Sequence, residues 1–402
     1  MAPRWAFAWW MMAGSVLMMG GQRTASAAEW SIEPSMSVRG EYHSNLLLAL
    51  EPQPSTYAYW ISPAVQVAGA TETLQVGSRL AFDYVEYQGE RDAKIYNLHV
   101  PLSVQYRQNR SVWGFTGGLD RDNTLRSELL ETGVVLAFAQ RNLWSAGPSW
   151  TYSVTERLSA QTSYQYNKAD YQGNSERLFL FDYEVHSANE TLSYTVTDKD
   201  SIQVTGLYTR FALPARGNLV ADTFGAQMGG THLFSEDLTL SASGGPRFIT
   251  NRVDTRIGTL EDTTTVWVFS ARAAKKWERG TLSVEVARDI FPSGFGLLIK
   301  KEHLLMKADY QITDHLTVAI NGQASIINPV ATNELFTGGV RFRETRFFHI
   351  DPHLRWRFAE YWAMDLGYMY SRRELEGTDR IGESHAVRLL LTYVPLKFSI
   401  SR

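Results

Sequence analysis

The 402-residue sequence contains no cysteine. Its fold therefore does not depend on disulfide bonds or on thiolate metal sites. Beyond residue 19 it also has no apolar run that approaches the roughly 20 residues of a membrane-spanning helix. Neither sign of charge dominates, because 39 Lys and Arg stand against 42 Asp and Glu, and nothing in this balance suggests nucleic-acid binding. Another kind of pattern must hold this chain together.

The first 27 residues have the composition of an export signal. Arg4 precedes a largely apolar run of 15 residues from Trp5 to Met19, and Ala25 and Ala27 form an A-x-A cleavage site. The run is too short for a transmembrane helix. We therefore expect residues 1–27 to be a cleaved signal peptide and residues 28–402 to form one domain. Without Arg4 and Arg23 that domain has 37 basic and 42 acidic side chains, a formal charge of −5.

The domain alternates apolar and polar residues over long stretches. In residues 158–167 one face carries Leu158, Ala160, Thr162, Tyr164 and Tyr166, and the residues between them are all polar. A period of two predicts β-strands. Aromatic residues are 12% of the chain, which is typical of strands that face lipid on one side and water on the other.

A short polar turn recurs along the chain and is followed each time by an alternating run. The first apolar residues after these turns are 34 to 46 residues apart: Leu74, Val112, Leu158, Ile202, Leu238, Leu282, Leu316 and Trp362. This spacing matches a hairpin of two membrane-spanning strands of roughly 10 to 12 residues with one turn and one loop. With a ninth outgoing strand near Ser37 to Tyr42, nine hairpins predict an all-β transmembrane antiparallel barrel of about 18 strands, with 16 as the alternative. A propeller has a similar period, but its blades hold four short strands each.

The stretch F-H-I-D-P-H-L-R-W-R-F (348–358) places five ionisable residues on one face of a strand. A buried core would not accept them, whereas a water-filled lumen would. Applied to every strand, the same alternation predicts these lumen-lining residues: Arg79, Asp83, Arg247, Arg272, Glu285, Lys307, Asp309, His349, Asp351, His353, Arg355, Arg357 and Arg388. Their mixed signs suggest either a pore for polar, weakly charged solutes or salt bridges that stiffen the wall.

A metal site at His349, Asp351 and His353 is disfavoured by geometry. Residues i and i+4 of an extended strand are about 13 Å apart, which is too far for both histidines to bind one ion. No serine nucleophile arrangement or phosphate-binding loop stands out, since S-G-G-P-R (243–247) is not followed by a predicted helix. We therefore expect no metal, no cofactor and no catalysis.

The longer connections are predicted to be exterior loops and the short polar turns periplasmic, which places both termini in the periplasm. The predicted loops are Leu46 to Ser55, Gly89 to Lys94, Arg121 to Arg141, Gln172 to Arg177, Pro214 to Val220, Asp254 to Asp262, Pro292 to Gly296, Val330 to Glu344 and Leu375 to Glu383. Only about ten residues separate Ala28 from the first predicted strand, so the sequence offers no separate plug domain.

Three motifs carry a family resemblance: E-Y-H-S-N-L-L-L (41–48), Y-W-I-S-P-A-V-Q-V (59–67) and the repeated unit T-E-R-L-S-A (155–160). In these motifs the chain resembles the outer-membrane β-barrel porins of Gram-negative bacteria, including members found beside exopolysaccharide machinery. The resemblance covers essentially the whole mature chain. Such barrels usually end on an aromatic residue that the assembly machinery binds, whereas Phe398 here lies four residues before the end.

The resemblance implies an outer-membrane location, contacts with outer-membrane lipid and with the barrel-assembly machinery, and passive passage of small polar solutes. Two alternatives stay open. The barrel is the exit of an exopolysaccharide export system, with a polysaccharide as its partner, or it is a structural or receptor barrel without an open pore.

Overall fold

The computed structural model describes residues 28–51, 53–89, 92–124, 139–172, 180–214, 218–255, 258–330, 343–378 and 380–401. The predicted signal peptide lies outside the described residues. Among the residues described, no helix is long and apolar enough to cross a membrane.

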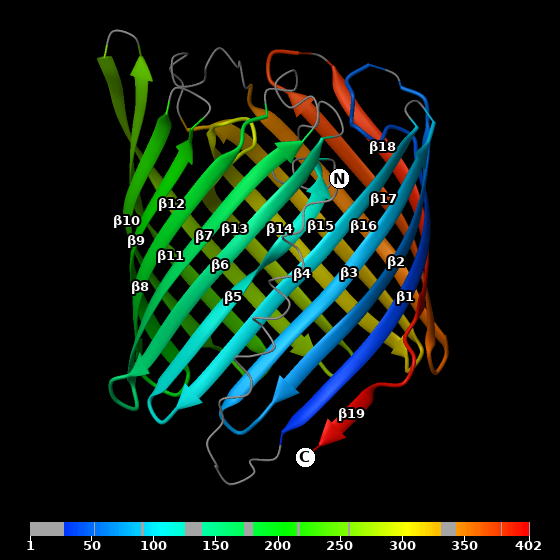
Figure 1. Ribbon diagram of the computed structural model, residues 1–402, viewed down its shortest axis with the longest axis horizontal. Coiled ribbons are helices and arrows are strands. Elements are labelled where there is room, and N and C mark those ends of the chain that lie inside the picture. Colours follow the sequence, from blue (N-terminus) through cyan, green and yellow to red (C-terminus); the bar gives the residue numbers. More distant parts are fainter. Residues whose placement is uncertain are drawn as a thin grey trace, which may run out of the picture.

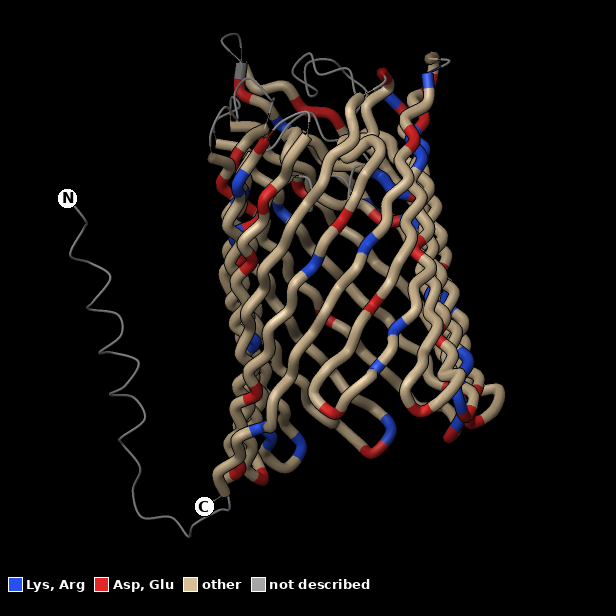
Figure 2. The backbone as a smooth tube through the Cα atoms, turned by 90° about the vertical axis from the view of Figure 1, so that its right-hand side faces the viewer, with Lys and Arg blue, Asp and Glu red and all other residues tan. Residues whose placement is uncertain are grey.

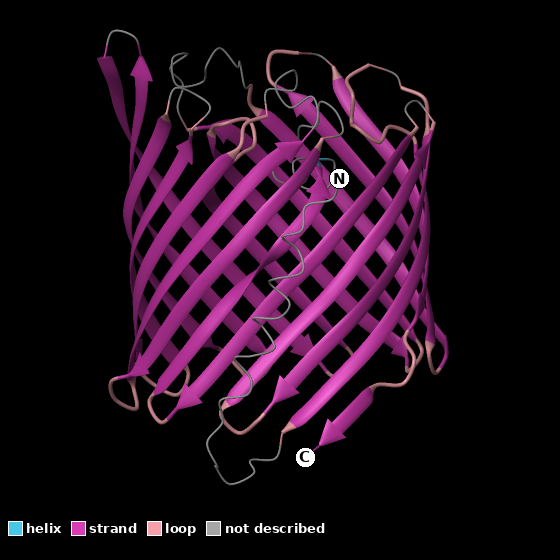
Figure 3. Cartoon of the chain, viewed as in Figure 1, coloured by secondary structure: helices cyan, strands magenta, loops and turns pink. Residues whose placement is uncertain are grey.

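The described chain is built from β-strands joined by turns and loops (Figure 3). The strands are β1 (Glu29–His43), β2 (Thr56–Ala70), β3 (Leu74–Gln88), β4 (Ala93–Gln108), β5 (Ser111–Asn123), β6 (Gln140–Ser153), β7 (Leu158–Gln172), β8 (Tyr183–Thr195), β9 (Asp200–Leu213), β10 (Leu219–Leu233), β11 (Leu238–Thr255), β12 (Gly258–Trp277), β13 (Gly280–Pro292), β14 (Leu298–Thr313), β15 (Leu316–Pro329), β16 (Thr345–Ala359), β17 (Trp362–Leu375), β18 (Ile381–Tyr393) and β19 (Phe398–Ser401).

Each strand from β1 to β18 pairs antiparallel with the next, and the sheet closes on itself. Met36–His43 of β1 pairs with β18. After a break at residues 394–397, β19 pairs with Glu29–Ile32 of β1 and so continues the path of β18. The result is a closed barrel of 18 strands, if β19 is taken as the continuation of β18 (Figure 1). The short turns and the C-terminus lie at one end and the longer connections at the other. The predicted fold class and strand number are confirmed, and a propeller is excluded.

The recurring polar turn has a simple chemical basis. In four turns a threonine or serine hydroxyl accepts a hydrogen bond from the backbone N–H three residues later, at the start of the next strand: Thr71 from Leu74, Thr155 from Leu158, Thr197 from Asp200 and Ser235 from Leu238, at 2.9 to 3.1 Å. Hydroxyl side chains stabilise turns in this way. The repeated T-E-R-L type of sequence is therefore a set of hairpin turns at one rim.

Large apolar side chains cover the outer face of the barrel. Trp267 is 63% exposed, and Val38, Phe82, Trp113, Trp150, Leu304 and Leu389 are also exposed on their strands. Exposing one such side chain to water rather than to an apolar environment costs about 2 kcal/mol of free energy. This surface is therefore suited to lipid. Charged positions occur along the height of the wall, and turns at the short-turn rim carry both signs (Figure 2).

Three boundary predictions need correction. The first strand begins at Glu29 rather than near Ser37, because Glu29–Ile32 is paired with both β2 and β19. The predicted loop Asp254 to Asp262 is mostly strand, since β11 and β12 stay paired up to Thr255 and Gly258. The predicted loop Arg121 to Arg141 is shorter than expected, because β5 and β6 pair up to Asn123 and Gln140; its centre, residues 125–138, lies outside the described residues.

Candidate functional site in the barrel lumen

The alternation of β1 separates an inner from an outer surface. Its odd-numbered residues Ser35, Ser37, Arg39, Glu41 and His43 line a cavity, whereas its even-numbered apolar residues are exposed on the other side. All thirteen charged residues selected from the sequence lie at the same inward parity on their own strands, opposite the exposed apolar side chains.

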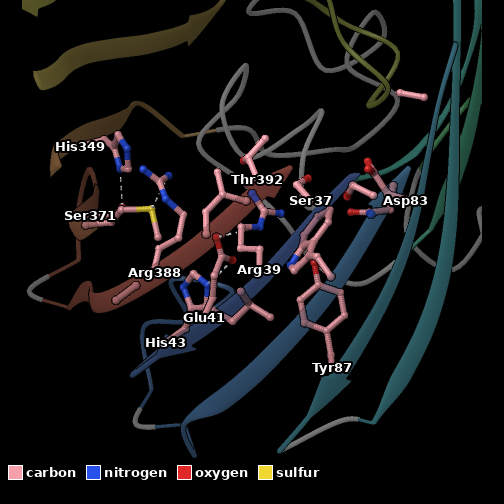
Figure 4. A pocket seen from close by; sticks show the side chains of 18 of the residues that line it. Ser37, Arg39, Glu41, His43, Asp83, Tyr87, His349, Ser371, Arg388 and Thr392 are labelled. Atoms are coloured by element: carbon pink, nitrogen blue, oxygen red, sulfur yellow. Dashed lines mark hydrogen bonds and ion pairs between the residues drawn. The ribbon is translucent and has the colours of Figure 1, made fainter. Parts of the chain in front are cut away.

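A cavity of about 600 Å³ lies against the inner wall formed by β16, β17, β18, β1, β2 and β3, with His99 of β4 and Asn123 of β5 at one side (Figure 4). Five of the predicted residues line it: Arg79, Asp83, His349, Arg355 and Arg388. Hydroxyl groups and the rings of Trp60, Tyr87 and Phe347 also line it, the hydroxyl groups being those of Ser37, Ser62, Ser371, Ser384 and Thr392. The first strand and the last strands of the chain thus meet at one candidate site, because barrel closure joins β1 to β18.

Several charges at this site are neutralised locally. An Nη atom of Arg388 lies 3.3 Å from Asp351 and 3.4 Å from Asp365. Glu41 forms ion pairs with Arg39 at 3.4 Å and with His43 at 3.1 Å. His99 contacts Asp120 at 2.8 Å and Asp83 at 3.7 Å. The Arg388 and His99 contacts join neighbouring strands, whereas the Glu41 pairs lie within β1. Salt bridges within the wall, one of the two alternatives for the mixed charges, thus occur for part of the set.

Two arginines at the cavity are different. Neither Arg79 nor Arg355 forms an ion pair or a side-chain hydrogen bond with the described residues around it, yet both line the cavity. A guanidinium group has five N–H donors and cannot lose its charge in a protein. The cavity therefore offers two guanidinium groups that no carboxylate of the described residues contacts directly, and these favour a carboxylate or another anionic group on a solute.

Two buried donors also point to a ligand. Trp60 is 8% exposed and Ser384 is 5% exposed, and neither the indole Nε1 nor the serine Oγ has a hydrogen-bond partner among the described residues. Arg39 covers the Trp60 ring, with Cζ 3.7 Å from the ring centroid. Since an unsatisfied buried polar group costs about 1 to 3 kcal/mol, a solute or water that supplies acceptors here relieves that cost.

The other predicted residues lie elsewhere on the inner face or bind only the wall itself. Arg247 donates to Gln227 Oε1 at 2.6 Å and Arg272 to Ser283 Oγ at 3.1 Å. Arg357 donates to the backbone oxygen of Asp314 at 2.7 Å. Glu285 lies 3.7 Å from His303, Asp309 accepts a hydrogen bond from Thr281, and Lys307 and His353 are on β14 and β16 away from the cavity lining.

His349, Asp351 and His353 do not converge on one point. His349 Nδ1 hydrogen-bonds Ser371 Oγ at 2.8 Å, while His353 Nδ1 lies 3.3 Å from the backbone oxygen of Asp351. No group of three or more His, Asp or Glu side chains that could hold a metal ion occurs among the described residues.

The sequence selection omitted Arg39, Glu41, His43 and His99, although they lie at the site. The signal was present in S-x-S-x-R-x-E-x-H (35–43), where every second residue is polar. The alternation of polar inward and apolar outward residues could not identify Trp60 and Tyr87, because both are aromatic residues that face inward.

An apolar cluster fills the inner side of the wall at the loop end of β7 to β11. Its buried members include Tyr171, Tyr183, Phe211, Leu213 and Ile249, and it is completed by Phe295 from the β13–β14 connection. The backbone N–H of Phe181, from the β7–β8 connection, donates to Gly294 O at 2.8 Å. Two connections from distant strands therefore meet inside the mouth, and they narrow this part of the lumen while the cavity lies along the β16–β3 wall.

No family model matches the chain, and no curated protein does. Among solved structures, several bacterial proteins are similar to the chain over most of its length. The chain is 11% identical to OprD of Pseudomonas aeruginosa, with a TM-score of 0.47 and coverage of 92% of this chain and 95% of that chain. For P. aeruginosa OccK7 (OpdD) the values are 9%, 0.47, 92% and 99%, and for Acinetobacter baumannii OccAB3 they are 9%, 0.45, 91% and 99%. The 18-strand architecture itself is established by the strand pairings of this chain.

Proposed function

We propose that this protein is an outer-membrane channel for the passive passage of small polar solutes, with a preference for anionic ones and with both termini in the periplasm. A barrel of 18 strands is of the size at which an aqueous channel remains. Its outer surface suits lipid and its inner face carries ionised side chains. In this proposal the chain catalyses no reaction and holds no cofactor.

One observation carries the preference for anions. Arg79 and Arg355 line the 600 Å³ cavity without a carboxylate partner among the described residues, whereas Arg388 and Arg39 there are neutralised by acidic neighbours. Unpaired guanidinium groups raise the local concentration of anions and bind carboxylates in two-pronged geometry. The unpartnered indole N–H of Trp60 adds a neutral hydrogen-bond donor.

The meeting of the connections at Phe181 and Gly294 favours one alternative, a structural or receptor barrel whose pore stays closed. An exit for exported polysaccharide would need a wide lumen, and no described residue favours it over the smaller pore.

Swelling of proteoliposomes separates these functions. In vesicles that contain the protein we expect swelling in galactose and faster swelling in the size-matched anion galacturonate, and we expect Arg79→Gln plus Arg355→Gln to abolish the difference. Arg157→Gln, in a turn outside the lumen, is the control and should retain the preference. Vesicles that do not swell in either sugar would support the closed barrel.

A further inference from the structure

The wall of the barrel is interrupted between β12 and β13. The pairing of these strands covers Phe269–Trp277 with Gly280–Arg288 and then stops. Both strands continue beyond this point: β12 remains paired with β11 up to Gly258, and β13 remains paired with β14 up to Pro292. Residues 258–268 of β12 and 289–292 of β13 therefore lack the ladder that joins these strands lower down.

Next to the interruption, the β13–β14 tip turns into the lumen. Ser293 N–H donates to Leu297 O at 3.0 Å, and Gly296 takes a φ of 73°, a conformation in which glycine is strongly preferred. Phe295 and Leu297 are 4% and 3% exposed. The tip packs against β7 to β11, and β13 stays paired with β14 up to Pro292, so pairing is lost only between β12 and β13.

We call the unpaired residues 258–268 of β12 and 289–292 of β13 the seam. At the seam, apolar side chains of outward parity contact apolar side chains inside the barrel. Ile290 and Leu298 have the outward parity of the exposed residues Val286 and Leu304, yet both pack against the apolar cluster inside the mouth. Val266 and Leu260 of β12 join the same cluster from the other edge. An apolar lining is unexpected in a lumen that is otherwise polar.

The seam begins at the upper limit of the lipid-facing surface. Going up β12, the outward residues change from Phe269 and Trp267 to Thr265, Thr263 and Glu261. A tryptophan at such a transition is typical of the membrane interface. On β13 the Arg288 guanidinium lies 5.4 Å from the Phe269 ring centroid and forms an ion pair with Glu302 at 2.9 Å.

A hollow lies on each side of the wall: the inner one borders residues 289–292 of β13, and the outer one lies over β13 to β17 and reaches β12 at Phe269. Inside, a cavity of about 400 Å³ is lined by Leu143, Tyr183, Phe291, Asp289, Lys301 and His303. Outside, a groove of about 430 Å³ has an apolar floor that includes Val286, Leu304 and Phe348, with Arg346 and Arg372 at its charged edge. His303 contributes to both.

We propose that the β12–β13 seam is a lateral passage between the lumen and the outer leaflet for single-chain amphipathic molecules with an ionised headgroup. This inference rests on the proposed function as a membrane channel. The apolar part of the molecule contacts Phe269, Ile290 and Phe291, and its headgroup meets the charged residues that border each hollow. A polar solute, in contrast, follows the β16–β3 wall.

The absence of native cysteine makes a bridging test specific. Val268→Cys plus Asp289→Cys places one thiol on each side of the seam, one register step beyond the Phe269 and Arg288 pair, and a short bis-maleimide joins them. Ser270→Cys plus Ala287→Cys, a pair of the same inward parity within the intact ladder, is the matched control. The probe is a short-chain lysophospholipid with a nitrobenzoxadiazole label, and the readout is its transfer from the vesicle surface to albumin trapped inside.

We expect the seam bridge to slow protein-dependent transfer at least about tenfold, a barrier increase of about 1.4 kcal/mol, while galactose swelling and the control bridge show no such change. Ile290→Asp, which puts a charge in the apolar contact without any cross-linker, should slow transfer in the same way. Transfer that is equal with and without the bridge, or equal to that of protein-free vesicles, would overturn the passage. Loss of galactose swelling in the unbridged protein would instead contradict the proposed channel.

Discussion

The double substitution Arg355→Glu plus Arg357→Glu tests how far the charge of the inner wall controls ion flow. Both residues lie on the inward face of β16, in the half nearer the short-turn rim, and neither forms an ion pair with the described residues. The change alters the lumenal charge by four units. Because cations are then attracted and anions repelled, ion selectivity should move toward cations.

The size of this effect follows from distance and screening. At about 10 Å each charge interacts with a monovalent ion by about 0.4 kcal/mol in water, and screening at about 0.1 M salt reduces this to about a third. Four charges then change the free energy of each ion in the lumen by about 0.6 kcal/mol, or roughly threefold in local concentration. Since the two ions move in opposite directions, the cation-to-anion permeability ratio should rise by about eightfold.

The assay is the reversal potential of reconstituted channels under a KCl gradient. Arg110→Glu plus Arg157→Glu changes the same charge in two turns outside the strands and should give a much smaller shift. The shift should shrink in 1 M salt, where the Debye length falls to about 3 Å. A reversal potential that is unchanged in the β16 variant would show that these side chains do not face the conducting path.

Three further substitutions probe separate parts of the structure. Trp60→Phe keeps an aromatic ring beneath Arg39 but removes the unpartnered N–H. The galacturonate concentration that blocks half of the current should therefore rise about two- to tenfold. An unchanged blocking concentration would exclude this donor from the site. Phe295→Ala removes a buried ring, a change that typically costs about 3 to 5 kcal/mol of stability in a packed core. Because this loosens the β13–β14 tip, single-channel conductance should rise. An unaltered conductance would show that the tip does not narrow the pore. Arg388→Met leaves Asp351 and Asp365 without their cation and should lower the free energy of unfolding in urea by about 2 kcal/mol. Replacing both aspartates by asparagine in the same chain should restore the stability. Equal stability of Arg388→Met and the unsubstituted protein would refute a structural role for the cluster.

Local patterns were sufficient to predict the barrel and its strand number. Alternation with a period of two is a property of neighbouring residues, and the Thr and Ser turns, such as Thr155 with Leu158, mark hairpins without information from distant parts of the chain. The inward parity of Arg79, Asp83, Arg355 and Arg388 follows from the same rule. The first strand was placed too late, since Glu29 to Ile32 pairs with β2 and also with the distant β19, and the pairing with β19 has no local signal in the sequence.

The candidate site was only partly predictable, since it depends on closure of the barrel. Arg39 and Arg388 are separated by almost the whole chain, and only the pairing of β1 with β18 brings their strands together. The apolar cluster and the seam were missed for a related reason. The β13–β14 tip enters the lumen because of packing against β7 to β11, including the Phe181 and Gly294 hydrogen bond, and no local pattern in F-P-S-G-F-G (291–296) specifies that packing.

Single-channel recording in planar bilayers tests directly whether the 18-strand barrel contains an open aqueous pore. We expect discrete current steps after insertion of the purified protein, with a selectivity for anions that Arg79→Gln plus Arg355→Gln reduces. Insertion without current steps, shown by protease-resistant protein in the bilayer, would contradict the account and leave a closed barrel.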